Sequence, residues 1–144
     1  MPKKTYTSVP TDYPVCLYDD CPKAATCLCH FAYTQVTEKD NYLRLANPLL
    51  CTKDDGCRYY RDSKPVTYVR GFTNFQKKMF PGQYEQFMHI LIGKFGRNAY
   101  YERRRGDTAI SPKEQQAILA ALRKVGVEEE MQFDAYEEHI NWYD

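Results

Sequence analysis

Cysteines are the residues whose type and spacing most directly indicate chemistry in this 144-residue chain. Four cysteine thiolates can hold one zinc ion in a closed tetrahedral site. Paired ligands of a common zinc knuckle are separated by about two to four residues; Cys16-x4-Cys21 is at the upper end of this range, and Cys51-x5-Cys57 is spaced more widely. The sequence therefore predicts a structural zinc site whose four ligands are drawn from Cys16, Cys21, Cys27, Cys51 and Cys57.

Other uses of the thiols stay open from the sequence alone. Four thiolates would also hold an iron–sulfur cluster, and free cysteines are often buried as small apolar side chains. Cys29 and His30, close behind Cys27, add further candidate ligands. Disulfides are not expected, because the N-terminus has no apolar segment of a secretory signal and thiols stay reduced in the cytosol. We therefore expect a cytoplasmic protein.

A run of three arginines, Arg103-Arg104-Arg105, is the second feature that could do chemistry. The planar guanidinium group can donate two hydrogen bonds to guanine or to phosphate, and an asparagine amide can pair with adenine. The sequence predicts DNA binding by one side of a helix over residues 97–105, through Arg97, Asn98, Tyr101, Arg103, Arg104 and Arg105. The alternative is a solvated helix end, where positive charge is favourable because of the helix dipole.

Charge is unevenly distributed along the chain, although the formal net charge is only +1. Residues 73–127 hold ten basic and four acidic side chains, whereas residues 128–144 hold seven acidic side chains and no basic one. A basic block favours an anionic partner such as nucleic acid. The acidic residues could instead cover the arginines within one molecule, which would give the basic block a structural role.

The elements expected around the arginines are helices. Apolar residues recur at helical spacing before the arginines, and glycine is expected to end the helix that carries them. Ser111-Pro112-Lys113-Glu114 is a capping box that begins another helix, and a similar pattern at Asp134 predicts a last one. The expected helices cover residues 83–95, 97–105, 112–125 and 136–142, after a short helix over 75–80 that ends at Pro81-Gly82.

The N-terminal half has a different pattern. We expect a poorly ordered arm over residues 1–14, a helix after Pro22, and a turn at Asp54-Asp55-Gly56. Short strands are expected over residues 58–61 and 66–70. The fold class that follows is mainly α within an α+β fold. Its two parts are a Cys-rich region over residues 1–72 and a helix-turn-helix-like helical region with an acidic tail over residues 73–144.

Two resemblances support this interpretation. The stretch G-R-N-A-Y-Y-E-R-R-R-G, followed by I-S-P-x-E-Q, resembles the end of a repressor-type helix-turn-helix over residues 82–127, which implies a DNA-reading helix. The elements C-x4-C-P, N-P-x-x-C, Y-Y-x-R-R-R-G and I-N-W-Y-D resemble a family of small Bacteroidetes proteins, a domain of unknown function.

Catalysis and membrane insertion are not expected. The histidines His30, His89 and His139 lie in unrelated contexts, and the sequence has no phosphate-binding loop. No apolar run approaches the length of about 20 residues that a membrane helix needs. The alternative to DNA binding is a protein-interaction module, in which the acidic aromatic segment YEEHINWYD binds a partner or a second copy of the chain.

Overall fold

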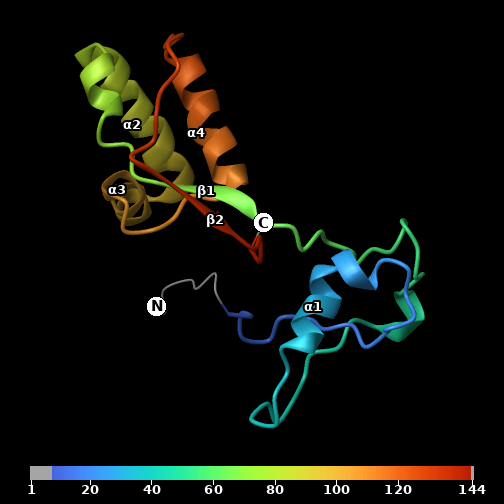
Figure 1. Ribbon diagram of the computed structural model, residues 1–144. Coiled ribbons are helices and arrows are strands. Elements are labelled where there is room, and N and C mark those ends of the chain that lie inside the picture. The colour runs from blue at the N-terminus through green and yellow to red at the C-terminus, as the bar shows by residue number, and fades with distance from the viewer. Residues whose placement is uncertain (1–7, 144) are drawn as a thin grey trace. The chain divides into compact units, whose positions relative to one another are not determined.

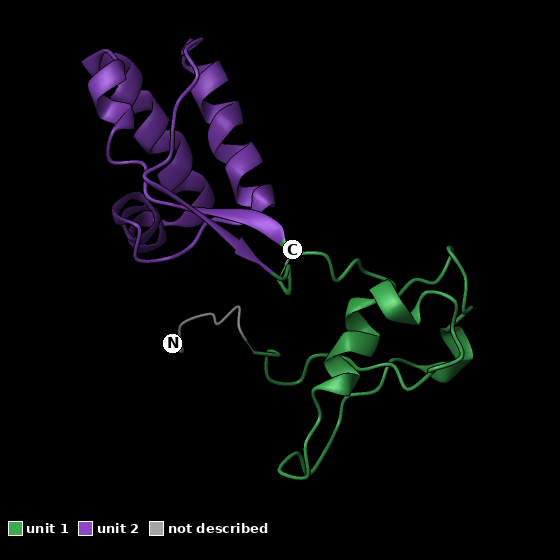
Figure 2. Ribbon diagram, viewed as in Figure 1, with its two compact units in different colours: residues 1–65, 140–143 green, residues 66–139, 144 purple. Residues whose placement is uncertain are grey.

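The chain divides into two compact units (Figures 1 and 2). A computed structural model describes residues 8–143. The N-terminal unit comprises the chain up to Pro65 together with Ile140–Tyr143, and the C-terminal unit comprises Val66–His139. Within the described residues there are four α-helices and one two-stranded antiparallel sheet, so the expected α+β fold is confirmed. The predicted arm lies partly outside the described residues.

The main elements follow one another in a simple order. The N-terminal unit contains α1 (Leu28–Thr34), which lies between two short 3-10 helices, Ala24–Thr26 and Pro48–Leu50. The C-terminal unit contains β1 (Val66–Arg70), a 3-10 helix (Phe75–Lys78), α2 (Pro81–Phe95), α3 (Arg97–Arg105), α4 (Pro112–Lys124) and β2 (Ala135–His139). Helix α2 packs against α3 and α4, and both of these helices contact β1 (Figure 1).

Local signals account for the three long helices of the C-terminal unit, and their predictions are confirmed. The Ser111 hydroxyl accepts a hydrogen bond from the Glu114 N–H at 3.3 Å, and the Glu114 carboxylate accepts one from the Ser111 N–H at 3.4 Å. Gly106 ends α3 in the left-handed conformation, with φ of 88°. Pro81 and Gly82, however, begin α2 instead of only ending the preceding short helix, because proline is compatible with the first turn of a helix.

The predicted last helix over residues 136–142 is wrong, because Ala135–His139 forms β2 and residues 140–142 have no regular secondary structure. Strand β2 pairs with β1 in a register that places Val66 opposite His139 and Arg70 opposite Ala135. The Asp134 carboxylate does not cap a helix. Instead it accepts hydrogen bonds from the backbone and side chain of Thr73, at 3.1 and 2.7 Å, and from the Asn74 amide at 3.2 Å.

The predicted strand over residues 58–61 is also wrong, since these residues have turn and irregular conformations. Arg61, in this segment, makes hydrogen bonds to other parts of the N-terminal unit instead of to a neighbouring strand. The Arg61 carbonyl accepts a hydrogen bond from the Leu28 N–H at 2.7 Å. The Arg61 guanidinium donates to the Asn141 carbonyl at 3.0 Å and to the Trp142 carbonyl at 3.4 Å.

The two units differ in the size of their apolar cores. The C-terminal unit has a core of 14 buried residues, rich in aromatic rings such as Phe72, Phe75 and Phe87. The core of the N-terminal unit contains four buried residues, Val15, Leu28, Ala32 and Trp142. So small a core rarely stabilises a fold without a further constraint. None of the helices within residues 8–143 is long and apolar enough to cross a membrane.

Candidate metal centre

All six cysteines of the chain line one small cavity in the N-terminal unit. The cavity has a volume of about 20 Å³, enough for a body of about the size of one water molecule. The five cysteines predicted as metal ligands all line this cavity, together with Cys29, which lies outside the predicted ligand set. His30 and three tyrosine rings complete part of the wall.

Backbone hydrogen bonds place the first cysteines beside α1. The Cys16 N–H donates to the Cys29 carbonyl at 3.1 Å. Cys27 is the N-terminal flanking residue of α1, and its neighbour Leu28 is held by Arg61, so the start of the helix faces the segment that follows Cys57. Cys16, Cys27 and Cys29 thereby reach one cavity from two distant segments of the chain.

A tight turn brings the last two cysteines to the same cavity, as the Asp54-Asp55-Gly56 pattern predicts. The Asp54 carboxylate accepts hydrogen bonds from the Thr52 hydroxyl at 2.5 Å and from the Gly56 N–H at 2.9 Å. The Cys57 N–H donates to the Asp54 carbonyl at 3.2 Å, which closes the turn. An aspartate that bonds the backbone two residues further on is a common way to stabilise such a turn.

The thiols of Cys16, Cys51 and Cys57 form one group of close neighbours. Burial, together with the charges and hydrogen bonds of Cys16 and Cys57, raises the pKa of the Cys51 thiol to about 11. A raised pKa means that the protein alone disfavours the thiolate form. A bound cation of charge two reverses this preference, because it deprotonates the thiols that coordinate it.

Cys27 and Cys29 form a second group, in which the thiols are hydrogen-bonded to each other. The Cys29 thiol lowers the pKa of Cys27, and the backbone N–H groups of His30, Arg61 and Cys29 lower it further. The pKa of Cys29 is raised by the same hydrogen bond and by burial. The Cys29 sulfur also lies 3.2 Å from the Tyr59 carbonyl oxygen, which is a second acceptor for its one thiol proton.

His30 lines the cavity but is engaged elsewhere. Its Nε2 atom lies 3.1 Å from the Asp19 carboxylate, and its Nδ1 atom lies 3.1 Å from the Cys16 carbonyl. Both ring nitrogens thus have partners. Across residues 8–143, no three His, Cys, Asp or Glu side chains already stand in an arrangement that could hold a metal ion. Metal binding at this cavity would therefore require the thiols to move closer together.

The predicted DNA-contacting residues lie on α3, but two of its arginines are bound within the C-terminal unit. The Arg103 Nε atom donates to the Glu114 carboxylate at 2.6 Å, and the Arg103 guanidinium stacks 5.0 Å from the centre of the Phe95 ring. Arg104 donates to the Gln76 side chain at 3.1 Å and lies 5.8 Å from the centre of the Tyr84 ring.

The remaining predicted contact residues are more open to solvent. Arg97 and Asn98 are exposed, Tyr101 is half-buried against the core, and Arg105 is exposed and paired with Asp107 at 3.0 Å. The ion-pair partner of Arg103 comes from α4 and that of Arg105 from the following loop. Within residues 8–143, the acidic residues of 128–138 therefore do not pair with these arginines of α3. From those residues, Glu137 pairs with Arg70 at 2.6 Å.

Two features of the sites were missed from the sequence. Cys29 is not in the predicted ligand set, although its spacing of two from Cys27 places both residues at the start of one short helix. Trp142 was assigned to a C-terminal interaction segment, whereas it is buried in the core of the N-terminal unit. The two-residue spacing from Cys27 is a sequence signal that could have identified Cys29. No such signal exists for Trp142, because its ring contacts join segments about 110 to 130 residues apart.

Comparison with known proteins identifies the family of the chain. No curated protein and no solved structure matched the sequence. A family model described as a family of unknown function, DUF6078, matches residues 1–142. Because the match spans almost the whole sequence, the chain belongs to the DUF6078 family.

Proposed function

We propose that the N-terminal unit is a zinc-binding module in which the metal has a structural role. The observation that carries this proposal is the convergence of all six cysteines on one cavity of about 20 Å³. Cys16, Cys51 and Cys57 are the centre of the ligand set, and one thiolate from Cys21 or from the Cys27–Cys29 pair completes it. Thiolates are soft donors that favour zinc over magnesium or calcium.

The small core of the N-terminal unit supports a structural role for the metal. Its four buried residues leave much of this unit held by loops and turns. Metal binding supplies folding free energy where the apolar core is insufficient. The spacing of the two outer cysteine pairs does not prevent a shared site, because the chain folds back so that both pairs line the same cavity.

The test is the metal content of the protein purified under reducing conditions. We expect one zinc ion per chain, and after exchange with Co²⁺ we expect an absorption band from charge transfer between thiolate and cobalt. A Cys51→Ser variant should lose most of the metal, whereas an Arg58→Gln variant should keep it, since Arg58 is exposed next to Cys57 and does not line the cavity.

Two results would count against this proposal. Iron and sulfide in the purified protein would show that the thiols hold an iron–sulfur cluster and not a zinc ion. A folded protein that binds neither zinc, iron nor Co²⁺ would mean that the cysteines are buried as small apolar residues.

If the protein contains zinc, single serine variants of Cys21, Cys27 and Cys29 identify the fourth ligand, because only the loss of that ligand should lower the zinc content strongly.

The second candidate function is DNA binding by the C-terminal unit through a helix-turn-helix-like surface. The observation that favours it is the exposure of Arg97 and Asn98 at the start of α3, in a segment with an excess of basic residues. Arg103 and Arg104 would support the helix through Glu114 and Gln76 instead of reaching the DNA. The contact set is thus narrowed to Arg97, Asn98 and Arg105, with Tyr101 beside them.

Fluorescence anisotropy of labelled duplex DNA in a salt series tests this candidate. We expect the double variant Arg97→Gln/Arg105→Gln to bind more weakly and to reduce the slope of log K against log salt by roughly 0.9 for each lost phosphate contact. The matched control is Arg123→Gln/Lys124→Gln, which removes the same charge from the exposed end of α4. Equal weakening by the two double variants would contradict a specific role for α3.

A protein partner is a less direct alternative. Trp142 is buried in the core of the N-terminal unit, so it does not offer an exposed docking group. A partner, or a second copy of the chain, would have to use exposed residues of the acidic C-terminal segment such as Tyr136 and Glu138. Partner binding therefore stays a prediction from sequence.

A further inference from the structure

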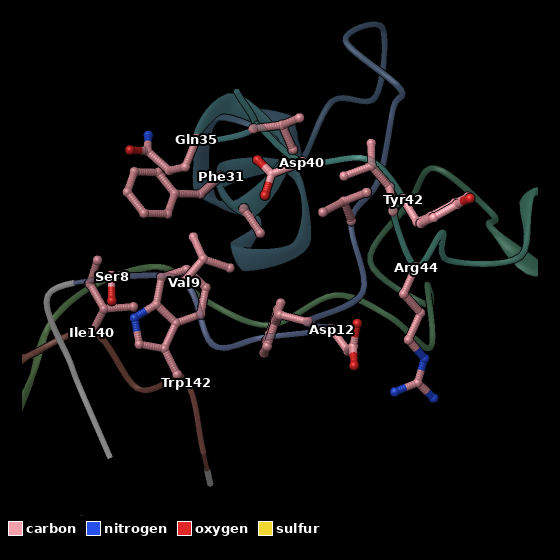
Figure 3. Close-up of a pocket in the computed structure, with 15 residues that line it drawn as sticks. Ser8, Val9, Asp12, Phe31, Gln35, Asp40, Tyr42, Arg44, Ile140 and Trp142 are labelled. Carbon is pink, nitrogen blue, oxygen red and sulfur yellow. The ribbon is translucent and has the colours of Figure 1, made fainter. Parts of the chain in front are cut away.

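A second cavity of the N-terminal unit is large enough for a small organic ligand. It has a volume of about 390 Å³, within the range of roughly 300–1,000 Å³ that is usual for ligand pockets. Its lining comes from α1, the segment before Cys16, the loop over residues 40–44, and Ile140 and Trp142 (Figure 3). This cavity does not share a lining residue with the cysteine cavity.

The lining separates into an apolar part and a charged part. The rings of Phe31 and Trp142 lie together, with centres 5.9 Å apart, and Val15 and Val36 add aliphatic surface. In Figure 3 the charged ends of Asp12 and Arg44 lie away from these rings, on another side of the pocket. A ligand that fills the cavity would therefore meet apolar groups at one end and both signs of charge at the other.

The two charged residues, Asp12 and Arg44, come from neighbouring segments, and their side chains have no polar partner among residues 8–143. The Val15 N–H donates to the Arg44 carbonyl at 2.8 Å, which places the segment after Asp12 beside Arg44. Among residues 8–143, neither side chain takes part in an ion pair or a side-chain hydrogen bond. The third charged lining residue differs, because the Asp40 carboxylate accepts hydrogen bonds from the Thr37 N–H at 2.8 Å and hydroxyl at 3.4 Å.

Two further observations distinguish this wall from an ordinary surface hollow. Asp12 has φ of 61°, a left-handed conformation that is uncommon outside glycine and clusters at ligand-binding positions. Trp142 is 4% exposed, and its indole N–H has no acceptor among the described residues. The cavity wall thus contains a buried indole N–H without an acceptor in the described part of the protein, which is unusual because most buried polar groups are hydrogen-bonded.

We propose that this cavity binds a free α-amino acid with an apolar side chain. The guanidinium of Arg44 binds the carboxylate, because its planar fork donates two parallel hydrogen bonds to such a group. The Asp12 carboxylate binds the ammonium group. The side chain of the ligand packs against Phe31 and Trp142, where burial of apolar surface adds affinity.

Trp142 provides a direct probe, because it is the one tryptophan of the chain. The experiment titrates the purified full chain with L-leucine, which does not fluoresce, and follows the tryptophan emission, with calorimetry as a second measurement. We expect a saturable change with L-leucine. N-acetyl-L-leucine, L-leucinamide and glycine each lack one of the three recognised groups and should bind about tenfold more weakly or worse.

Matched variants assign the charged contacts. Asp12→Asn removes the charge but keeps a residue that tolerates the left-handed conformation, and Arg44→Gln removes the guanidinium; each should weaken L-leucine binding about tenfold or more. Arg58→Gln, an exposed arginine outside the cavity, should bind L-leucine like the unchanged protein. Circular dichroism checks that all variants are folded.

Several results would overturn this proposal. One is the absence of saturable binding of L-leucine in both fluorescence and calorimetry. Another is an equal response to the three analogues, which would mean that the cavity takes up apolar groups without recognising the amino acid. Unchanged affinity in both Asp12→Asn and Arg44→Gln would exclude the assigned contacts. Because this cavity lies in the unit that the proposed zinc site would stabilise, the titrations use protein whose metal content and fold have been checked. Failure of L-leucine binding in that folded protein overturns this proposal and leaves the zinc proposal standing.

Discussion

Removal of the metal from the zinc-loaded protein is expected to unfold the N-terminal unit while the C-terminal unit stays folded. The N-terminal core has four buried residues, so it has little apolar burial to replace the coordination of the thiols. Structural zinc contributes an apparent free energy of about 10–16 kcal/mol in small zinc-dependent domains at neutral pH. Even a fraction of this value exceeds what so small a core supplies.

The two units can be followed separately in this experiment. Trp142 belongs to the N-terminal core, so a strong chelator should move its emission toward that of a solvated indole. The helical circular dichroism should fall only slightly, since α2, α3 and α4 account for most of the helical residues and lie in the C-terminal unit. Restoring zinc under reducing conditions should restore the emission. Unchanged emission after verified loss of the metal would show that the N-terminal unit does not depend on it.

The Phe87→Ala variant is expected to have the largest effect of any single substitution on the C-terminal unit. Phe87 is fully buried in α2 and lies 6.0 Å from Phe72 and 6.3 Å from Phe75 between ring centres. Replacing a buried phenylalanine with alanine removes apolar contacts and leaves a cavity, at a cost of about 3–5 kcal/mol. That cost is comparable with the whole free energy of unfolding of a marginal domain.

Phe80→Ala is the matched control for this prediction. It is the same substitution just before the same helix, but Phe80 is 76% exposed, so we expect a change within about 0.5 kcal/mol. Urea unfolding followed by helical circular dichroism measures both variants, because Trp142 reports on the other unit. Equal loss of stability in the two variants would contradict the assignment of Phe87 to the core and of Phe80 to the surface.

The helices of the C-terminal unit could be predicted because their determinants are local in sequence. The Ser111–Glu114 capping box is complete within four residues, and Gly106 ends α3 directly after the arginines. Strand β2 could not be predicted in the same way. Its partners in β1 lie 65 to 73 residues earlier, and Asp134 is engaged by Thr73 and Asn74 instead of capping a helix.

The contrast between local determinants and contacts distant in sequence also explains how much of the candidate sites could be predicted. Cysteine is uncommon enough for its positions to indicate a shared site, but the approach of the Cys16, Cys51 and Cys57 thiols depends on contacts across the N-terminal unit. The roles of the arginines depend on similar contacts. Glu114 on α4 holds Arg103, and Gln76 from before α2 holds Arg104. A count of charges along the sequence cannot separate these two bound arginines from the exposed Arg97.

The path of the chain between its units has a consequence for synthesis of the protein on the ribosome. The chain leaves the N-terminal unit at Pro65 and returns to it at Ile140, and the pair Val66 and His139 joins the two ends of the inserted segment. Trp142, which packs against Tyr13 and Phe31, is translated after the whole C-terminal unit. The N-terminal unit therefore completes its core last, although most of its residues are made first.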